Sequence, residues 1–259
     1  MNYPNQVARI DAQLASVACT ADQAGVTLVR RTLEELDDRW YGKFVVGVYG
    51  SLADAPDIEA VIPAATAIEL LRGYCRLRSE LLVQVTDERA HSLSHDESTA
   101  LLAGDYLYTS AYSLLDSLGY PALGACSEIL TDVLMDVTAA FVTGYRQQSP
   151  SKLDSTAFFD ATTGTIGEGA ALLGATLARA EENKYESIAR VGRGYSTSRQ
   201  IRRILGADPG LFKVVPRLID ESKLQTHADF WRENAEVALC DLSTTTDVTP
   251  LRLLVEANE

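Results

Sequence analysis

Five arginines crowd one short stretch of a chain that has few basic residues elsewhere. The 259-residue sequence holds 23 Lys and Arg against 36 Asp and Glu, and the cluster comprises Arg190, Arg193, Arg199, Arg202 and Arg203. Residues three and four apart share a helix face, so we expect Arg199, Arg202 and Arg203 to point the same way. Guanidinium groups match phosphate oxygens, so one hypothesis is that these arginines bind an anion directly.

A second charged stripe precedes this cluster in the chain. It contains Arg72, Arg76, Glu80, Gln84 and Asp87, and Arg76 can pair with Glu80 across one helical turn. Since buried charges generally have partners, we favour the interpretation that arginine–carboxylate pairs close the pocket, over direct binding of an anion. If the site is catalytic instead, Glu80 is the candidate general base.

Two weaker candidates for metal ligation lie at the end of this stripe. His91 and His95 are four residues apart, but no third ligand is evident and the serine-rich surroundings favour a capping or surface role. The other is an oxygen-rich patch that could bind a metal weakly, although a solvated helix end explains it better. Its members are Glu80, Gln84, Asp87 and Glu88.

The composition limits the classes of partner. A net charge of −13 and a pI near 4.7 argue against nucleic acid or an anionic membrane surface. The acidic residues are 19 Asp and 17 Glu, whereas only five of the basic residues are Lys. Such a surface suits a cytoplasm rich in salt, so a halophilic source and an ordinary acidic cytosolic protein are equally good explanations.

The cysteines and the first residues bear on the compartment. Cys19, Cys75, Cys126 and Cys240 form no C-x-x-C pair, which argues against a zinc ribbon or a redox pair. We interpret them as buried free thiols in a reducing compartment and predict a cytoplasmic protein. The N-terminus lacks the basic and apolar regions of a signal peptide, and no uncharged apolar run is long enough to span a membrane.

Apolar residues recur at three- and four-residue steps along most of the chain, which predicts an all-α protein. Asp57, and either Ser94 or Asp96, are plausible N-caps, and alternating strand patterns are missing. We expect residues 1–259 to form one domain, a helical bundle around a central cavity. The Gly- and Ala-rich residues 161–180 indicate close helix packing, or alternatively room for a ligand. The predicted helices span 5–38, 57–90, 94–118, 122–147, 155–181, 184–206, 224–242 and 249–257.

Five segments, in order over about 200 residues, resemble the trans-isoprenyl diphosphate synthases, also called polyprenyl synthetases. "LAGDYL" at 102–107 matches the family's A-x-L-A-G-D-x-L, and "ELL" at 69–71 matches the helix that carries the first aspartate motif. The resemblance implies an isoprenoid-synthase-type bundle. The other matches are Gly42 and Lys43 (G-G-K-R-x-R-P), Thr156 and Ala157 (K-T-A-x-L-F), and Gly192, Gln200 and Ile201 (G-x-x-L-G-x-A-F-Q-I-x-D-D-x-L-D).

In that family two aspartate clusters on facing helices hold Mg²⁺ ions, which bind the diphosphate of an allylic substrate. The alignment places Ser79, Glu80 and Val83 at the first cluster, so one carboxylate of three remains. The second cluster falls at residues 202–204, where no acidic pair remains. Arginine cannot ligate Mg²⁺ and repels it. We therefore expect no Mg²⁺ cofactor and no ordinary prenyl chain elongation.

The resemblance also implies which residues would bind a substrate. Arg89 stands near the family's diphosphate-binding arginine pair. Tyr74 lies five residues before the first cluster, where an aromatic residue forms the floor of the family's prenyl pocket, although an ordinary core tyrosine is as good an explanation. The candidate substrate-binding residues are Lys43, Tyr74, Arg76, Arg89, Thr156, Arg199, Gln200, Arg202 and Arg203.

Three functions remain open on this reading. The first is a non-catalytic homologue that acts as partner subunit or regulator of an active prenyl diphosphate synthase, or that binds an isoprenoid. Since the family commonly dimerises, we expect a homodimer or such a heterodimer. The second is an enzyme that acts on an isoprenyl diphosphate, with arginine stabilising the leaving anion and Glu80 as base. The third is a functional prenyltransferase whose ligands lie elsewhere.

Overall fold

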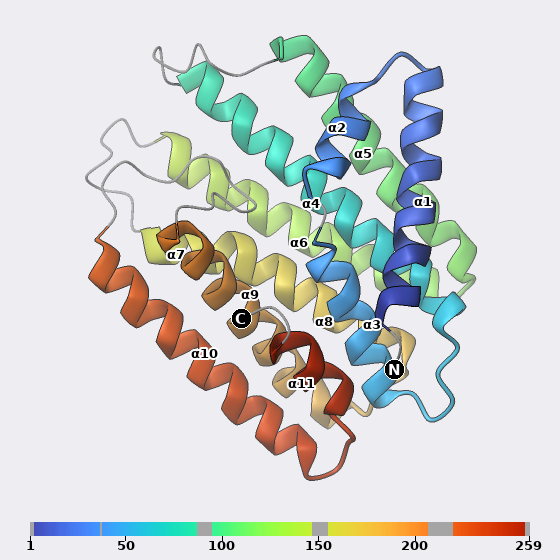
Figure 1. Ribbon diagram of the computed structural model, residues 1–259, viewed down its shortest axis with the longest axis vertical. Coiled ribbons are helices and arrows are strands. Elements are labelled where there is room, and N and C mark those ends of the chain that lie inside the picture. The colour runs from blue at the N-terminus through green and yellow to red at the C-terminus, as the bar shows by residue number, and fades with distance from the viewer. Residues whose placement is uncertain (1–2, 37, 87–94, 147–154, 207–219, 257–259) are drawn as a thin grey trace.

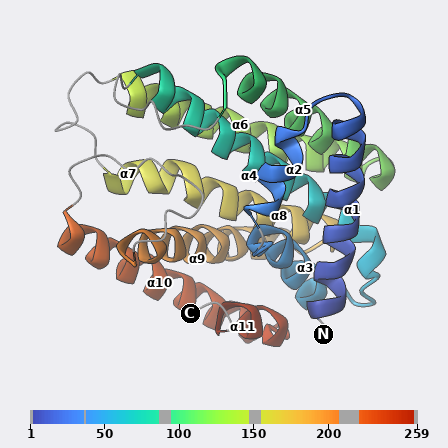
Figure 2. The same ribbon diagram turned by 45° about the horizontal axis from the view of Figure 1, so that its top comes forward.

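The computed structural model describes residues 3–36, 38–86, 95–146, 155–206 and 220–256, and these form helices without any strand. The predicted all-α fold is therefore confirmed. Helix α8 lies at the centre, in contact with α3, α4, α6 and α9, while α5 covers α4 and α10 covers α9 (Figures 1 and 2). The α-helices are α1 (Tyr3–Gln23), α2 (Leu28–Glu34), α3 (Trp40–Leu52), α4 (Ile58–Thr86), α5 (Glu97–Leu115), α6 (Ala122–Arg146), α7 (Ser155–Phe159), α8 (Thr165–Leu177), α9 (Tyr185–Leu205), α10 (Glu221–Ser243) and α11 (Thr249–Glu256).

Two of the predicted helix starts are confirmed by their caps. The Asp57 carboxylate accepts a hydrogen bond from the Glu59 amide at 3.1 Å, just before α4. At α5 the cap is Asp96, whose Oδ1 atom accepts from the Thr99 amide at 2.9 Å. A carboxylate at this place satisfies an amide that has no partner within its own helix.

The prediction of one helix over 5–38 is wrong, because the chain turns at Gly25. This glycine has a φ of +82°, in the left-handed region that a side chain disfavours. Helix α1 ends at Gln23 and α2 begins at Leu28. The chain leaves α2 after Glu34 and passes through Arg39, again left-handed at a φ of +47°, before α3 begins.

Helix α3 was not predicted, and its surroundings explain why. Its residues are buried on nearly every side, so it lacks the apolar and polar alternation that reveals a surface helix. The buried apolar residues of α3 belong to one continuous core, to which helices from α1 to α11 contribute.

The Gly- and Ala-rich segment packs closely against α9, as one of the two interpretations predicted. A Cβ atom on Gly167 would lie 2.3 Å from the Ser196 Cβ and 2.4 Å from the Gly192 carbonyl oxygen. Only a residue without a side chain lets the two backbones approach this far. The predicted helix over 155–181 is interrupted by a π-turn at Asp160–Gly164.

The prediction of buried free cysteines is confirmed in part. All four cysteines are free, as predicted, but only Cys75 and Cys126 are buried, whereas Cys19 and Cys240 are exposed. The prediction of buried thiols is therefore wrong for the last two, which lie on outward faces of α1 and α10. Within the described residues, every helix is too short or too polar to cross a membrane.

Candidate functional site

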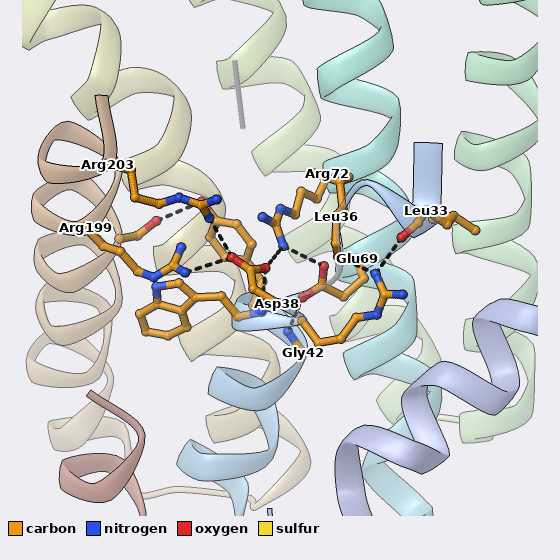
Figure 3. A network of polar contacts seen from close by, with 12 residues as sticks. Leu33, Leu36, Asp38, Gly42, Glu69, Arg72, Arg199 and Arg203 are labelled. Atoms are coloured by element: carbon orange, nitrogen blue, oxygen red, sulfur yellow. Dashed lines mark hydrogen bonds and ion pairs between the residues drawn. The ribbon is translucent and has the colours of Figure 1, made fainter. Parts of the chain in front are cut away.

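The Asp38 carboxylate lies at the centre of three guanidinium groups (Figure 3). Arg199 donates from Nη2 to Asp38 Oδ2 at 2.8 Å, and Arg203 donates from Nη1 to the same oxygen at 2.7 Å. Arg72 donates from Nη1 to Asp38 Oδ1. Two of these arginines come from α9 and one from α4, so a single carboxylate joins the two helices.

Arg39 holds Asp38 in this place by fixing the chain between α2 and α3. The guanidinium of Arg39 donates to the Leu33 carbonyl at 2.8 Å and to the Leu36 carbonyl, and so occupies carbonyls exposed at the end of α2. Its Nε atom donates to Asp11 of α1 at 2.6 Å. The segment that carries Asp38 is therefore anchored on both α2 and α1.

The network continues from α4 to the start of α3. Arg72 also donates to Glu69 Oε2 at 3.2 Å, and Glu69 Oε1 accepts from the Gly42 amide at 2.8 Å. Two rings of α3 line the arginines: the Arg72 guanidinium carbon is 5.4 Å from the Tyr41 ring centroid, and that of Arg199 is 5.6 Å from the Trp40 ring. These are distances at which a cation is attracted to an aromatic face.

Burial and charge compete at each member of the network. Burial alone would raise the pKa of Asp38, but the charge and hydrogen bonds of Arg72, and then of Arg199, hold it far below its ordinary value. Burial would lower the pKa of Arg72, but Glu69 and Asp38 raise it above its ordinary value. At Arg199 burial dominates and lowers the pKa. All three groups are thus charged near neutral pH.

The positions of the first aspartate cluster are also engaged. Ser79 and Glu80 on α4 are buried, and Glu80 Oε1 accepts from Arg76 Nε at 3.2 Å. The predicted pair of Arg76 with Glu80 is therefore confirmed. Arg76 also donates to Glu35 at the end of α2, so the carboxylates that complete both arginine stripes come from the same α2–α3 segment.

The residues at this site do not fit the Mg²⁺ ions of the resembled family. Glu80 is already paired with Arg76, and Arg203 presents only donors. In the part of the chain that is described, no group of three or more His, Cys, Asp or Glu side chains is arranged to hold a metal ion. The described residues do not include Asp87, Glu88, Arg89 and His91. Gln84 belongs to α4, but its side chain is not among those described.

Four of the five clustered arginines bind carboxylates in three different places. Arg199 and Arg203 reach Asp38, whereas Arg202 donates to Asp229 on α10 at 3.0 Å. Arg193 donates to Glu168 on α8 at 2.7 Å. The bonds of Arg199 and Arg203 to Asp38 support the interpretation that arginine–carboxylate pairs fill the site. Convergence of the whole cluster on one ligand is not supported.

The remaining candidate residues have different surroundings. Thr156 and Gln200 are buried, and Lys43 is half-buried in the first turn of α3. The Tyr74 ring centroid lies 5.9 Å from that of Tyr108 on α5, and the Arg78 guanidinium carbon lies 5.1 Å from the Tyr74 ring. Nothing in these surroundings tests whether the four residues contact a substrate, so their roles stay predictions.

Sequence and fold comparisons agree on the relatives of this chain. A short chain isoprenyl diphosphate synthase from Methanocaldococcus jannaschii is 25% identical over 183 residues, which are 64% of this chain and 54% of that protein. A geranyltranstransferase from Methanosarcina mazei superposes with a TM-score of 0.76 at 16% identity, covering 98% of this chain and 94% of the other. The chain is therefore similar in sequence to an isoprenyl diphosphate synthase and shares the fold of solved synthases of this kind.

Another isoprenyl diphosphate synthase structure shares the fold at similarly low sequence identity. The geranylgeranyl pyrophosphate synthetase of Geoglobus acetivorans gives a TM-score of 0.71 at 18% identity, covering 98% of this chain and 97% of the other. No model of a known protein family matches the chain. The chain spans about half the length of the curated synthase it matches.

Proposed function

We propose that this isoprenyl diphosphate synthase homologue is a non-catalytic subunit that pairs with a catalytic synthase. The observation that carries the proposal is the Asp38 network, in which arginines of α4 and α9 bind a carboxylate of the chain itself. In active members of the family these two helices would carry aspartates that bind metal. Here the charge at α9 has the opposite sign.

Removing Asp38 would leave Arg199 without its carboxylate and Arg72 with Glu69 alone. The Arg199 side chain is only 18% exposed, and an unpaired charge at such a position is destabilising. The pairs therefore support a structural role for the former metal region. A role that needs no chemistry at this place, such as that of a partner subunit, agrees best with them.

The outer face of α5 and α6 offers a surface for the partner. It carries large apolar side chains that are well exposed, and contiguous patches of this kind mark sites of protein association. The side chains with their exposed fractions are Leu101 (42%), Leu102 (60%), Tyr108 (38%), Met135 (65%) and Val142 (47%).

One contact between α5 and α6 lies within this face. The Tyr112 hydroxyl on α5 lies 3.0 Å from the Thr131 hydroxyl on α6. Along their own helices, Tyr108 lies one turn before Tyr112, and Met135 lies one turn after Thr131. The exposed apolar side chains thus extend along both helices from this contact.

A relative in fold supports the same assignment. The structure of a geranyl diphosphate synthase small subunit from Antirrhinum majus superposes with a TM-score of 0.60 at 16% identity, covering 90% of this chain and 92% of the other. That protein is a subunit of a larger synthase, so a chain of this fold can serve as one. We also propose a cytoplasmic location, since the four free thiols would persist in a reducing compartment.

Co-purification with a catalytic synthase tests the proposal. The tagged chain is expressed with an isoprenyl diphosphate synthase of the same organism that retains both aspartate motifs. We expect a stoichiometric complex by light scattering, with a changed product length or rate, and no elongation by this chain alone. Leu102→Glu and Met135→Glu should abolish the complex. Val237→Glu on α10, which replaces a side chain that is 51% exposed, is the matched control.

Two results would contradict this assignment. If the purified chain elongates an allylic diphosphate with isopentenyl diphosphate and Mg²⁺, it is a catalytic synthase. If Leu102→Glu and Met135→Glu bind the synthase as well as Val237→Glu does, the α5–α6 face is not the interface.

A second candidate function is metal-independent binding of an isoprenyl diphosphate. One observation favours it: the Arg72 Nε atom, although buried, has no hydrogen-bond partner among the described residues, so the guanidinium retains a donor for a phosphate oxygen. Calorimetric titration with geranylgeranyl diphosphate, with and without Mg²⁺, tests it. Saturable binding in the absence of metal, lost in Arg72→Gln, would favour this function; no binding in either condition would favour the subunit.

A further inference from the structure

A small pocket lies between α9, α10, α11 and Trp40, the first residue of α3. Its volume is about 190 Å³. Four arginines line it, three from α9 and one from α10, and Trp40 and Ser198 are among the other lining residues. The arginines are Arg199, Arg202, Arg203 and Arg232.

Four guanidinium groups around one small pocket make it cationic in a chain whose net charge is −13. Their carboxylate partners lie around the pocket rather than among its lining residues: Arg202 donates to Asp229 at 3.0 Å, and Arg232 donates to Glu236 at 2.7 Å. Arg199 shares Asp38 with two other arginines. An anion in the pocket would thus meet donors from several directions.

Two buried donors at this pocket have no partner within the described chain. Ser198 is only 2% exposed, and its Oγ atom makes no hydrogen bond. The Nε atom of Arg199 is buried and unpartnered as well. Buried polar groups are nearly always hydrogen-bonded, and one that is not destabilises the fold. Both residues line the pocket, so each keeps a donor that a ligand oxygen would satisfy once the atoms covering it shift.

The size of the pocket restricts the ligand. Sites for drug-sized molecules have about 300–1,000 Å³, and about 190 Å³ is too small for an isoprenyl chain. Arginine and hydroxyl donors together suit the several oxygens of a phosphate group. We infer that the pocket binds a phosphate group, either as the free ion or as part of a small phosphate monoester. The inference does not depend on the proposed subunit role.

Calorimetric titration of the full-length protein with inorganic phosphate, glycerol 3-phosphate and acetate tests the inference. We expect saturable binding of at least one phosphate compound and much weaker binding of acetate. The tighter of the two phosphate compounds tells whether the site takes the free ion or a monoester. Ser198→Ala and Arg232→Gln should each weaken this binding about tenfold, the usual effect of losing a hydrogen bond to a charged group.

The Ser198→Ala variant is the decisive one, because Ser198 Oγ has no partner to lose and the fold should be kept. Arg9→Gln, which changes an exposed arginine paired with Glu59 at 2.8 Å, should bind phosphate like the unmodified protein. Absence of saturable phosphate binding overturns the inference. So does equal binding of acetate, or phosphate binding that is unchanged in both Ser198→Ala and Arg232→Gln.

Discussion

Asp38 and Arg203 are 165 positions apart in the sequence, yet Asp38 Oδ2 and Arg203 Nη1 are 2.7 Å apart. The same carboxylate also binds Arg72 of α4. In the family that this chain resembles, metal ions link the two helices through aspartates. Here arginines occupy both helices and a carboxylate from the α2–α3 segment links them, so the signs of charge are exchanged while the link between α4 and α9 is kept.

Replacing Asp38 with asparagine should strongly destabilise the fold. The neutral amide would remove the charge that three guanidinium groups share, leaving Arg72 with Glu69 alone, and removing one partner of a buried ion pair lowers the free energy of unfolding by about 3–5 kcal/mol. Urea unfolding of Asp38→Asn measures this. Asp229→Asn is the matched control, because its pair with Arg202 is exposed and should matter little. Equal stability of the two variants would contradict a structural role for Asp38.

Acid should remove the contribution of Asp38 in a defined pH range. Its pKa in the folded state is far below the ordinary value of 3.8, so the unfolded state binds the proton first as the pH falls. The stabilisation is complete above about pH 5 and decreases below about pH 4, by up to ~1.4 kcal/mol per pH unit.

The measurement is urea unfolding of the unmodified protein and Asp38→Asn at pH 6, 4 and 3. Other carboxylates titrate in both proteins, so their effects cancel in the difference. We expect the difference in free energy of unfolding to shrink as the pH falls. A constant difference over this range would mean that Asp38 titrates normally.

The sequence predicted the elements with clear boundaries and missed those without them. The starts of α4 and α5 were found because Asp57 and Asp96 have side chains that cap a helix. Helix α3 was missed because it is buried on almost all sides, which removes the periodic pattern. The break between α1 and α2 depends on the left-handed conformation of one glycine, Gly25, and such a residue also occurs within helices.

The sequence predicted about half of the candidate site. The arginine stripes were visible because their members share a helix face, and the pair of Arg76 with Glu80 is local for the same reason. The partners Asp38 and Glu35 come from an irregular segment, and no local spacing relates them to α4 or α9. The one available signal was the run of carboxylates in "EELDDRW", just before the first match to the family.

The contact between α8 and α9 should not tolerate a methyl group. A Cβ atom on Gly167 would lie 2.3 Å from Ser196 Cβ, so Gly167→Ala should lower the free energy of unfolding by about 1–3 kcal/mol through overpacking. Gly124→Ala on α6 is the control, since a Cβ there meets nothing within 4 Å and the better helix propensity of Ala should keep or raise stability. Urea unfolding compares them, and an unchanged Gly167→Ala would contradict the close approach.

Mg²⁺ should not stabilise the folded protein. A ligand that binds only the folded state raises the unfolding midpoint as its concentration increases, but Glu80 is paired with Arg76 and the arginines of α9 repel a cation. We expect the thermal midpoint in about 10 mM MgCl₂ to match that in NaCl of equal ionic strength, which controls for screening. A saturable rise with Mg²⁺ that is lost in Glu80→Gln would contradict this and would make Glu80 a metal ligand. A rise that persists in Glu80→Gln would instead point to carboxylates near the end of α4, such as Asp87 and Glu88.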